Sequence, residues 1–243
     1  MMKIKPQLML LTASVIWGGG FVAGKLALDT LTPFAILAWR FGIAAALCGM
    51  IFHRRLRGTP RRTMLSGVAI GTLQMTALSL QLTGLQYTTS ARQSFLCTAY
   101  VVLTPFLSRV LLKRRLTLRA VTAGFISLAG IGCICLSGSL SFNIGDALSL
   151  GFALLFGIQV VLTGRFLADD TDSLQLSFFQ FLSAGGLALA IVLLRGDTLA
   201  PFSGTSLKGI LYLSVLNTLV AFLLQNTAQK TLPEITAALI ISL

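Results

Sequence analysis

Polar and aromatic side chains interrupt the long apolar runs of this 243-residue chain, and they are the residues that could do chemistry. Polar groups are costly inside a membrane span, so they tend to face the interior of a helix bundle or a water-filled cavity. Such groups near the bilayer midplane could bind a small solute weakly enough to release it. The candidates for this solute pathway are Trp17, Arg40, Gln74, Gln93, Tyr100, Gln159, Gln180 and Asn217.

Arg40 is the most informative candidate because it is charged. If its span begins near Pro33, Arg40 lies about 10 Å below the membrane surface, and an arginine side chain can reach much of that distance. It could therefore be an interfacial anchor or a structural donor between helices. It could also be the cation that binds the carboxylate of an amino acid or an organic acid. The sequence leaves both roles open.

The uncharged candidates have two possible roles as well. The amide side chains could hydrogen-bond a zwitterionic or amide solute, or they could only hold helices together. Trp17 could form a stacking wall and Tyr100 could offer its hydroxyl group, whereas aromatic residues in spans commonly serve packing. The sequence alone does not choose between these roles.

Three further residues are candidates for gating or helix packing. Gly20 and Gly24 have the GxxxG spacing that lets two helices approach closely, which would also let two bundles rock against each other. Pro105 lacks a backbone donor and loosens its helix, either as a static kink or as a gating flex point.

Several kinds of chemistry find no support in the sequence. The one histidine, His53, lies in a basic loop and cannot supply a catalytic pair, and no Walker A motif is present. The four cysteines have no metal-ligand spacing, and they are interpreted as packing residues. The acidic residues fall at span edges or in loops, so no buried carboxylate is expected. We therefore expect no enzyme, no metal site and no cofactor.

The composition indicates a chain solvated by lipid. Hydrophobic residues make up 55% of the sequence, charged residues only 11%, and the mean hydropathy is +0.87. The net charge of +12 lies in short loops between apolar runs. That distribution fits orientation in a membrane better than a phosphate-binding face, so the expected partner is the lipid bilayer and not a nucleic acid.

The apolar runs predict an all-α polytopic membrane protein with eight full spans and a partial ninth. The expected spans are residues 7–24, 33–52, 64–85, 93–112, 120–137, 146–163, 174–194 and 209–227. The last apolar segment begins near Ile235 and is too short to cross a bilayer. Lysine and arginine in the N-terminal head and in two alternate loops, HRRLRGTPRR and the loop after Lys113, place the N-terminus in the cytoplasm.

A faint repeat divides the chain. Trp17-Gly18 aligns with Phe156-Gly157, and Gln81 aligns with Gln225. Because five spans precede the second copy, the two copies must enter the membrane in opposite senses, as in many secondary carriers. We expect a first five-helix repeat over residues 1–138 and a second, incomplete repeat over residues 139–243.

Several segments together resemble the EamA-like branch of the drug/metabolite transporter superfamily. They are IWGGGFVAGKLAL, TPFAILAWRF, GLQYTTSARQSFLCTAYVVLTPF, LLKRRLT, GDALSLGFALLFGIQVVLTGRF and TLPEITAALIISL. The resemblance implies two inverted five-span repeats with both termini in the cytoplasm. It also implies alternating-access export of amino acids, other metabolites or drugs across the bacterial inner membrane.

The sequence departs from the family pattern in two places. Arg114 stands where the family usually has an acidic residue, and the chain ends where a ninth span should continue toward a tenth. We therefore expect a chain shortened at its C-terminus. The alternative to a working carrier is a truncated, non-transporting membrane protein or an interaction partner.

Overall fold

The computed structural model of the protein describes residues 5–135, 142–168, 171–200 and 203–243, and within these ranges it contains helices and no strand. The helices are α1 (Pro6–Leu28), α2 (Pro33–Leu56), α3 (Arg61–Leu85), α4 (Ser90–Thr98), α5 (Tyr100–Leu112), α6 (Leu118–Cys135), α7 (Ile144–Leu167), α8 (Ser173–Arg195), α9 (Gly204–Leu211), the π-helix η1 (Tyr212–Val220), α10 (Ala221–Gln229) and α11 (Glu234–Ile241).

Seven helical segments of the described ranges are long and apolar enough to cross a membrane. They are α1, α2, α3, α4 with α5, α7, α8, and the continuous segment from α9 through η1 to α10. Each contains one of the expected spans, so the prediction of long apolar helices at these seven positions is confirmed. Helix α6 lies where the fifth span was expected, and α11 occupies the short final segment. The protein is thus an all-helical, multi-pass membrane protein.

Local sequence signals set the helix starts. Thr32 accepts a hydrogen bond from the backbone N–H of Ala35 and precedes Pro33, so α2 has both a side-chain cap and a proline in its first turn. Asn143 and Asp146 form a reciprocal capping box at the start of α7. These caps satisfy backbone donors that would otherwise lack partners at the helix ends.

The fourth span is broken, but not at the position that the sequence indicates. Helix α4 ends at Thr98 and α5 begins at Tyr100, with Ala99 between them. Pro105 lies inside α5, a turn beyond the break. Since the missing N–H of Pro105 would have bonded the carbonyl of Val101, it weakens the first turn of α5 rather than creating the break itself.

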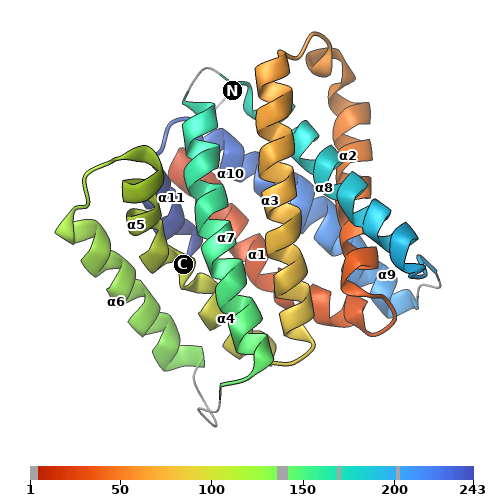
Figure 1. Ribbon diagram of the computed structural model, residues 1–243, viewed down its shortest axis with the longest axis horizontal. Coiled ribbons are helices and arrows are strands. Elements are labelled where there is room, and N and C mark those ends of the chain that lie inside the picture. The colour runs from red at the N-terminus through yellow and green to blue at the C-terminus, as the bar shows by residue number, and fades with distance from the viewer. Residues whose placement is uncertain (1–4, 136–141, 169–170, 201–202) are drawn as a thin grey trace.

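The long helices cross the bundle from one end to the other (Figure 1). We call the end that holds Arg55, in the last turn of α2, the basic end, and the other the opposite end. Helix α2 packs most extensively against α8, and α3 packs against both α7 and α8. Gly67 and Gly71 permit the α3–α8 contact, because a Cβ at Gly71 would lie 2.3 Å from the carbonyl oxygen of Gln180.

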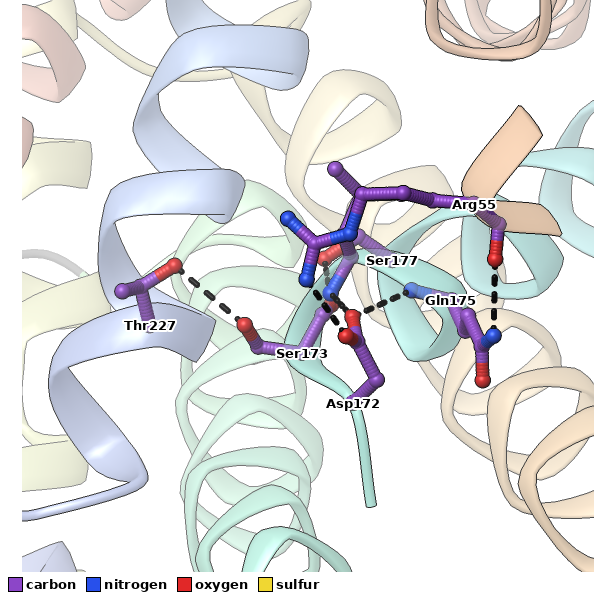
Figure 2. Close-up of polar contacts among 7 residues, drawn as sticks. Arg55, Asp172, Ser173, Gln175, Ser177 and Thr227 are labelled. Carbon is purple, nitrogen blue, oxygen red and sulfur yellow. Dashed lines mark hydrogen bonds and ion pairs between the residues drawn. The ribbon is translucent and has the colours of Figure 1, made fainter. Parts of the chain in front are cut away.

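A polar cluster joins α2, α8 and α10 at the basic end (Figure 2). Arg55 Nη2 donates to Asp172 Oδ2 at 2.6 Å, and the hydroxyls of Ser173 and Thr227 lie 3.4 Å apart. These contacts place the arginine-rich loop after α2 and the segment around Lys230 at the same end of the bundle. That is the arrangement expected from the charge distribution.

Asp172 also caps α8. Its Oδ1 accepts from the backbone N–H groups of Leu174 at 2.8 Å and Gln175 at 3.2 Å. Burial alone would raise the pKa of the Asp172 carboxyl, but the Gln175 N–H, the Arg55 guanidinium and the Leu174 N–H outweigh burial. The pKa of Asp172 therefore lies below its ordinary value of 3.8.

Candidate functional site

A cavity of about 340 Å³ lies inside the bundle, within the size range of small-molecule sites. Its walls come from the last turns of α3, from α4, from the middle of α1 and of α7, and from η1. Leu85 and Gln93, close to the opposite end, both line it. The cavity therefore extends from near the opposite end to the middle of the bundle, where Phe156 of α7 lines it.

The structure brings most of the predicted pathway residues together around this cavity. Trp17, Arg40, Gln93, Tyr100 and Asn217 line it, and so does Gly20. The cavity lining does not include Gln74, Gln159, Gln180, Gly24 or Pro105.

Arg40 is the charged side chain of the cavity lining, and it is only 3% exposed. Its Nε donates to Thr218 Oγ1 at 2.5 Å, and its Nη2 donates to Asn217 Oδ1 at 2.7 Å. Both partners are neutral groups on η1. Among the described residues, no carboxylate forms a salt bridge with Arg40.

Asn217 holds Arg40 in place and also ties η1 to α1. Its Nδ2 donates to the carbonyl oxygen of Ile16 at 3.1 Å, and Trp17 Nε1 donates to the Asn217 carbonyl oxygen at 2.9 Å. The two segments approach closely because Gly20 faces Asn217, and a Cβ there would lie 2.3 Å from Asn217 Nδ2. Gly20 is thus a position of close approach between α1 and η1. A Cβ at Gly24 would lie 3.4 Å from the side chains of Leu82 and Leu85, at the edge of ordinary contact. The gating role of both glycines stays a prediction.

Aromatic rings form another wall. Trp17 and Phe156 meet edge to face at 5.9 Å between centroids, and Tyr100 meets Phe156 edge to face at 5.0 Å. Phe152 stacks on Phe156 at 5.2 Å, and Phe222 lies 5.0 Å from Trp17. This wall can pack against the apolar part of a solute. The stacking role of Trp17 and the hydroxyl role of Tyr100 stay predictions.

Gln93 offers a hydrogen-bond acceptor in the cavity. Its Nε2 donates to the carbonyl oxygen of Gln81 at 2.7 Å, which fixes the amide. Its buried Oε1 has no hydrogen-bond partner among the described residues. Since buried polar atoms are nearly always paired, this oxygen is suited to accept from a donor group of a bound solute.

The remaining amide candidates lie nearer the basic end. Gln180 Nε2 donates to Gln74 Oε1, and Asn226 Nδ2 donates to Gln180 Oε1 at 2.9 Å. Gln159 Nε2 donates to Thr163 Oγ1 at 3.1 Å on the same helix. All five side chains are buried. Their part in a pathway stays a prediction.

Two buried carboxylates contradict the expectation that none exists. Asp146 is fully buried and pairs with Arg92 Nη2 at 2.6 Å, while Glu234 is 2% exposed. Glu234 accepts from Ser108 Oγ at 2.6 Å and lies 3.3 Å from Arg114 Nε. The prediction was wrong because a residue at a span edge is buried when neighbouring helix ends pack over it. Arg114, which departs from the family pattern, here has Glu234 as its partner.

Sequence reasoning also missed Thr218, which binds Arg40, and the π-helix that carries it. A threonine in an apolar run is common and cheap to bury, since it can bond its own helix. The repeat alignment offers a signal, because Thr218 lies as far before Gln225 as Gln74 lies before Gln81. Helix η1 has no comparable sequence signal, although π-helical turns occur often at functional sites.

The fold and the cavity together define a multi-pass helical membrane protein with an internal polar site. The EamA-like transporter family matches the chain twice, over residues 4–136 and residues 143–243. The chain therefore belongs to this family, within the drug/metabolite transporter superfamily.

Named relatives agree with this membership. An uncharacterized transporter of Archaeoglobus fulgidus is 31% identical over 241 residues, which cover 99% of this chain and 75% of the relative. The uncharacterized transporter YyaM of Bacillus subtilis is 28% identical over 181 residues, or 70% of this chain and 59% of the relative. A solved structure described as "Crystal structure of protein" shares the fold, with a TM-score of 0.78 at 17% identity, over 98% of this chain and 83% of that one.

Proposed function

We propose that this protein carries a small metabolite with an anionic group, such as an amino acid, out of the cell across the bacterial inner membrane by alternating access. The observation that carries the proposal is the buried guanidinium of Arg40, which lines the cavity. Among the described residues, its hydrogen-bond partners are all neutral. Leaving a buried charge uncompensated costs about 3–5 kcal/mol. A solute carboxylate beside Arg40 removes that cost.

The other walls of the cavity suit the rest of such a solute. The aromatic wall around Phe156 packs against an apolar side chain. The free Oε1 of Gln93 accepts from an ammonium group. A zwitterion therefore fits the cavity better than a purely anionic or purely apolar solute.

Alternating access rests on two inverted five-helix repeats, which we assign to residues 1–138 and 139–243. Arg40 and Gln180 lie about two turns after the first residues of α2 and α8, so they are equivalent. Arg40 donates a hydrogen bond to Thr218, and Gln180 donates one to Gln74. The repeat alignment makes Thr218 and Gln74 equivalent as well. The same contact thus occurs twice with the roles of the repeats exchanged, as a two-fold axis in the membrane plane requires. The two family matches fit the same division.

The basic end lies in the cytoplasm in this proposal. Arginines gather there in the loop between α2 and α3 and after α5, and positively charged loops stay inside during membrane insertion. The N-terminus is then cytoplasmic, and the cavity lies in the outer half of the membrane. This arrangement corresponds to an outward-facing state.

Transport by proteoliposomes tests the role of Arg40. We expect the wild-type protein to carry amino acids in preference to the corresponding amino-acid amides, which lack the carboxylate. Arg40→Gln keeps hydrogen-bonding capacity toward Asn217 and Thr218 but removes the charge, so it should abolish this preference, and Arg40→Lys should retain part of it. An Arg40→Gln protein that inserts normally and keeps the preference would exclude Arg40 from the site.

A further inference from the structure

The faces of three helices that line the cavity continue toward the basic end as amide and hydroxyl side chains. On α7, Phe152 and Phe156 line the cavity, and Gln159 and Thr163 follow on the same face. Within the described part of the chain, this polar strip on α7 lies between the cavity and the basic end.

The corresponding positions of α3 and α10 behave in the same way. On α3, Leu78 lines the cavity and Gln74 lies one turn nearer the basic end. On α10, Phe222 lines the cavity, and Gln225 and Gln229 follow. Polar groups on three helices therefore lie on the basic-end side of one cavity.

These amides are packed against one another in this structure. Asn226 Nδ2 donates to Gln180 Oε1 at 2.9 Å and to Ser177 Oγ at 2.8 Å, which connects α10 to α8. Gln229 Nε2 donates to the carbonyl oxygen of Val160 at 3.0 Å, which connects α10 to α7. No solute could pass between these described helices in this arrangement.

The packing leaves several amide atoms without partners. Gln74 Nε2, Gln159 Oε1, Gln225 Oε1 and Asn226 Oδ1 are buried and have no hydrogen-bond partner among the described residues. Amides kept only to hold helices together would be expected to satisfy these atoms, because an unpaired buried polar atom destabilises the fold. These atoms are therefore available to bond with water or with a solute.

We propose that these amides line the cytoplasmic half of the solute pathway, which is closed in this structure and opens when the basic end opens. The proposal rests on the proposed transport function. In the open state the three unpaired oxygens accept from water and from the ammonium or hydroxyl groups of the solute, and Gln74 Nε2 donates to its carboxylate. Arg40 binds the solute in the outer half and the amides receive it in the inner half.

Contacts between the two repeats keep this half closed. At the basic end, Arg55 of α2 pairs with Asp172, the N-cap of α8, as Figure 2 shows, and Arg114 pairs with Glu234 of α11. The Arg55 side chain is 63% exposed, so its ion pair is screened by water and easily exchanged. A weak, exposed pair such as Arg55–Asp172 suits a closure that must break in every transport cycle.

Thiol labelling in a cysteine-free background tests the closed pathway. Gln159→Cys lies on the proposed path, and Val161→Cys is a matched control because both native side chains are fully buried on α7, about 3 Å apart along its axis. The reagent is a small, membrane-impermeant thiosulfonate applied to inverted membrane vesicles, whose outer surface is the cytoplasmic face. We expect Gln159→Cys to react several-fold faster than Val161→Cys.

Asp172→Asn provides the second arm. Asparagine still caps α8 but cannot pair with the Arg55 charge, so the closed half should open more often and label Gln159→Cys faster, without change at Val161→Cys. Equal labelling at the two positions, with or without Asp172→Asn, would overturn the pathway. The proposed function would fail separately if wild-type proteoliposomes carried no amino acid. In that case Gln159→Cys could still label faster than Val161→Cys.

Discussion

The rings of Phe41 and Phe181 lie 6.4 Å apart between centroids where α2 and α8 cross, and both side chains are fully buried. The two residues occupy equivalent positions one residue after Arg40 and Gln180. In the proposed inverted repeat, the two-fold axis passes between these rings. On one side of them lies the open cavity with Arg40, and on the other lies the packed amide network with Gln180.

The hydrogen bond between Gln74 and Gln180 gives a first stability prediction. Gln74→Leu or Gln180→Leu should each cost about 1–3 kcal/mol, because each leaves a buried amide partner unpaired. The double variant should cost less than the sum of the two, since neither amide then remains. Thermal unfolding in detergent measures this coupling, and strictly additive losses would show that the two side chains do not depend on each other.

The close contact of α3 with α8 gives a second prediction. A Cβ at Gly71 would lie 2.0 Å from Ser183 Oγ and 2.3 Å from a backbone oxygen, so Gly71→Ala should force the helices apart and lower the unfolding temperature. Gly186→Ala is the control on α8, because no atom of a neighbouring described helix lies within 4 Å of the position that its new methyl group would occupy. It should be neutral or stabilising by up to about 1 kcal/mol, as expected from helix propensity. Equal effects of the two variants would contradict this packing.

The lowered pKa of Asp172 sets a pH dependence. Since the folded-state pKa lies below 3.8, the carboxylate contributes stability that is fully present above that value and is lost as pH falls through the folded pKa. The Arg55 pair is exposed and should contribute only about 0–1 kcal/mol, whereas Asp172→Ala also removes the α8 cap and should cost about 0.5–2 kcal/mol. Unfolding measured from pH 3 to 7 should show that the difference in stability between the wild type and Asp172→Ala shrinks only at the acidic end. A stability difference that stays the same at every pH would contradict this prediction.

The positions of the long helices could be predicted from the sequence, because the length of an apolar run and the charge of a loop depend on local composition. The sequence was also sufficient to select Trp17, Arg40 and Asn217 as candidates, since polar groups in spans face inward. It could not separate the amides that line the cavity from those packed beneath it. Gln74 lies on the same helix face as Leu78, and only the tertiary packing determines where along that face the cavity ends.

The other differences also depend on tertiary packing. The burial of Glu234 depends on Ser108 and Arg114, which are far from it in the sequence. The break at Ala99 and the π-helix at Asn217 follow from how neighbouring helices pack, which no local pattern of residues encodes.

Labelling of Ser94→Cys tests most directly whether the Arg40 cavity is the solute site. Ser94 lines the cavity and is half-buried. In a protein where Ser94→Cys supplies the only cysteine, a small impermeant thiosulfonate applied to the external face should react with it. A transported amino acid should slow that reaction, its amide should not, and Arg40→Gln should remove the protection. Labelling of Ser94→Cys from the cytoplasmic face alone, or protection that persists in Arg40→Gln, would contradict an outward-facing site built on Arg40.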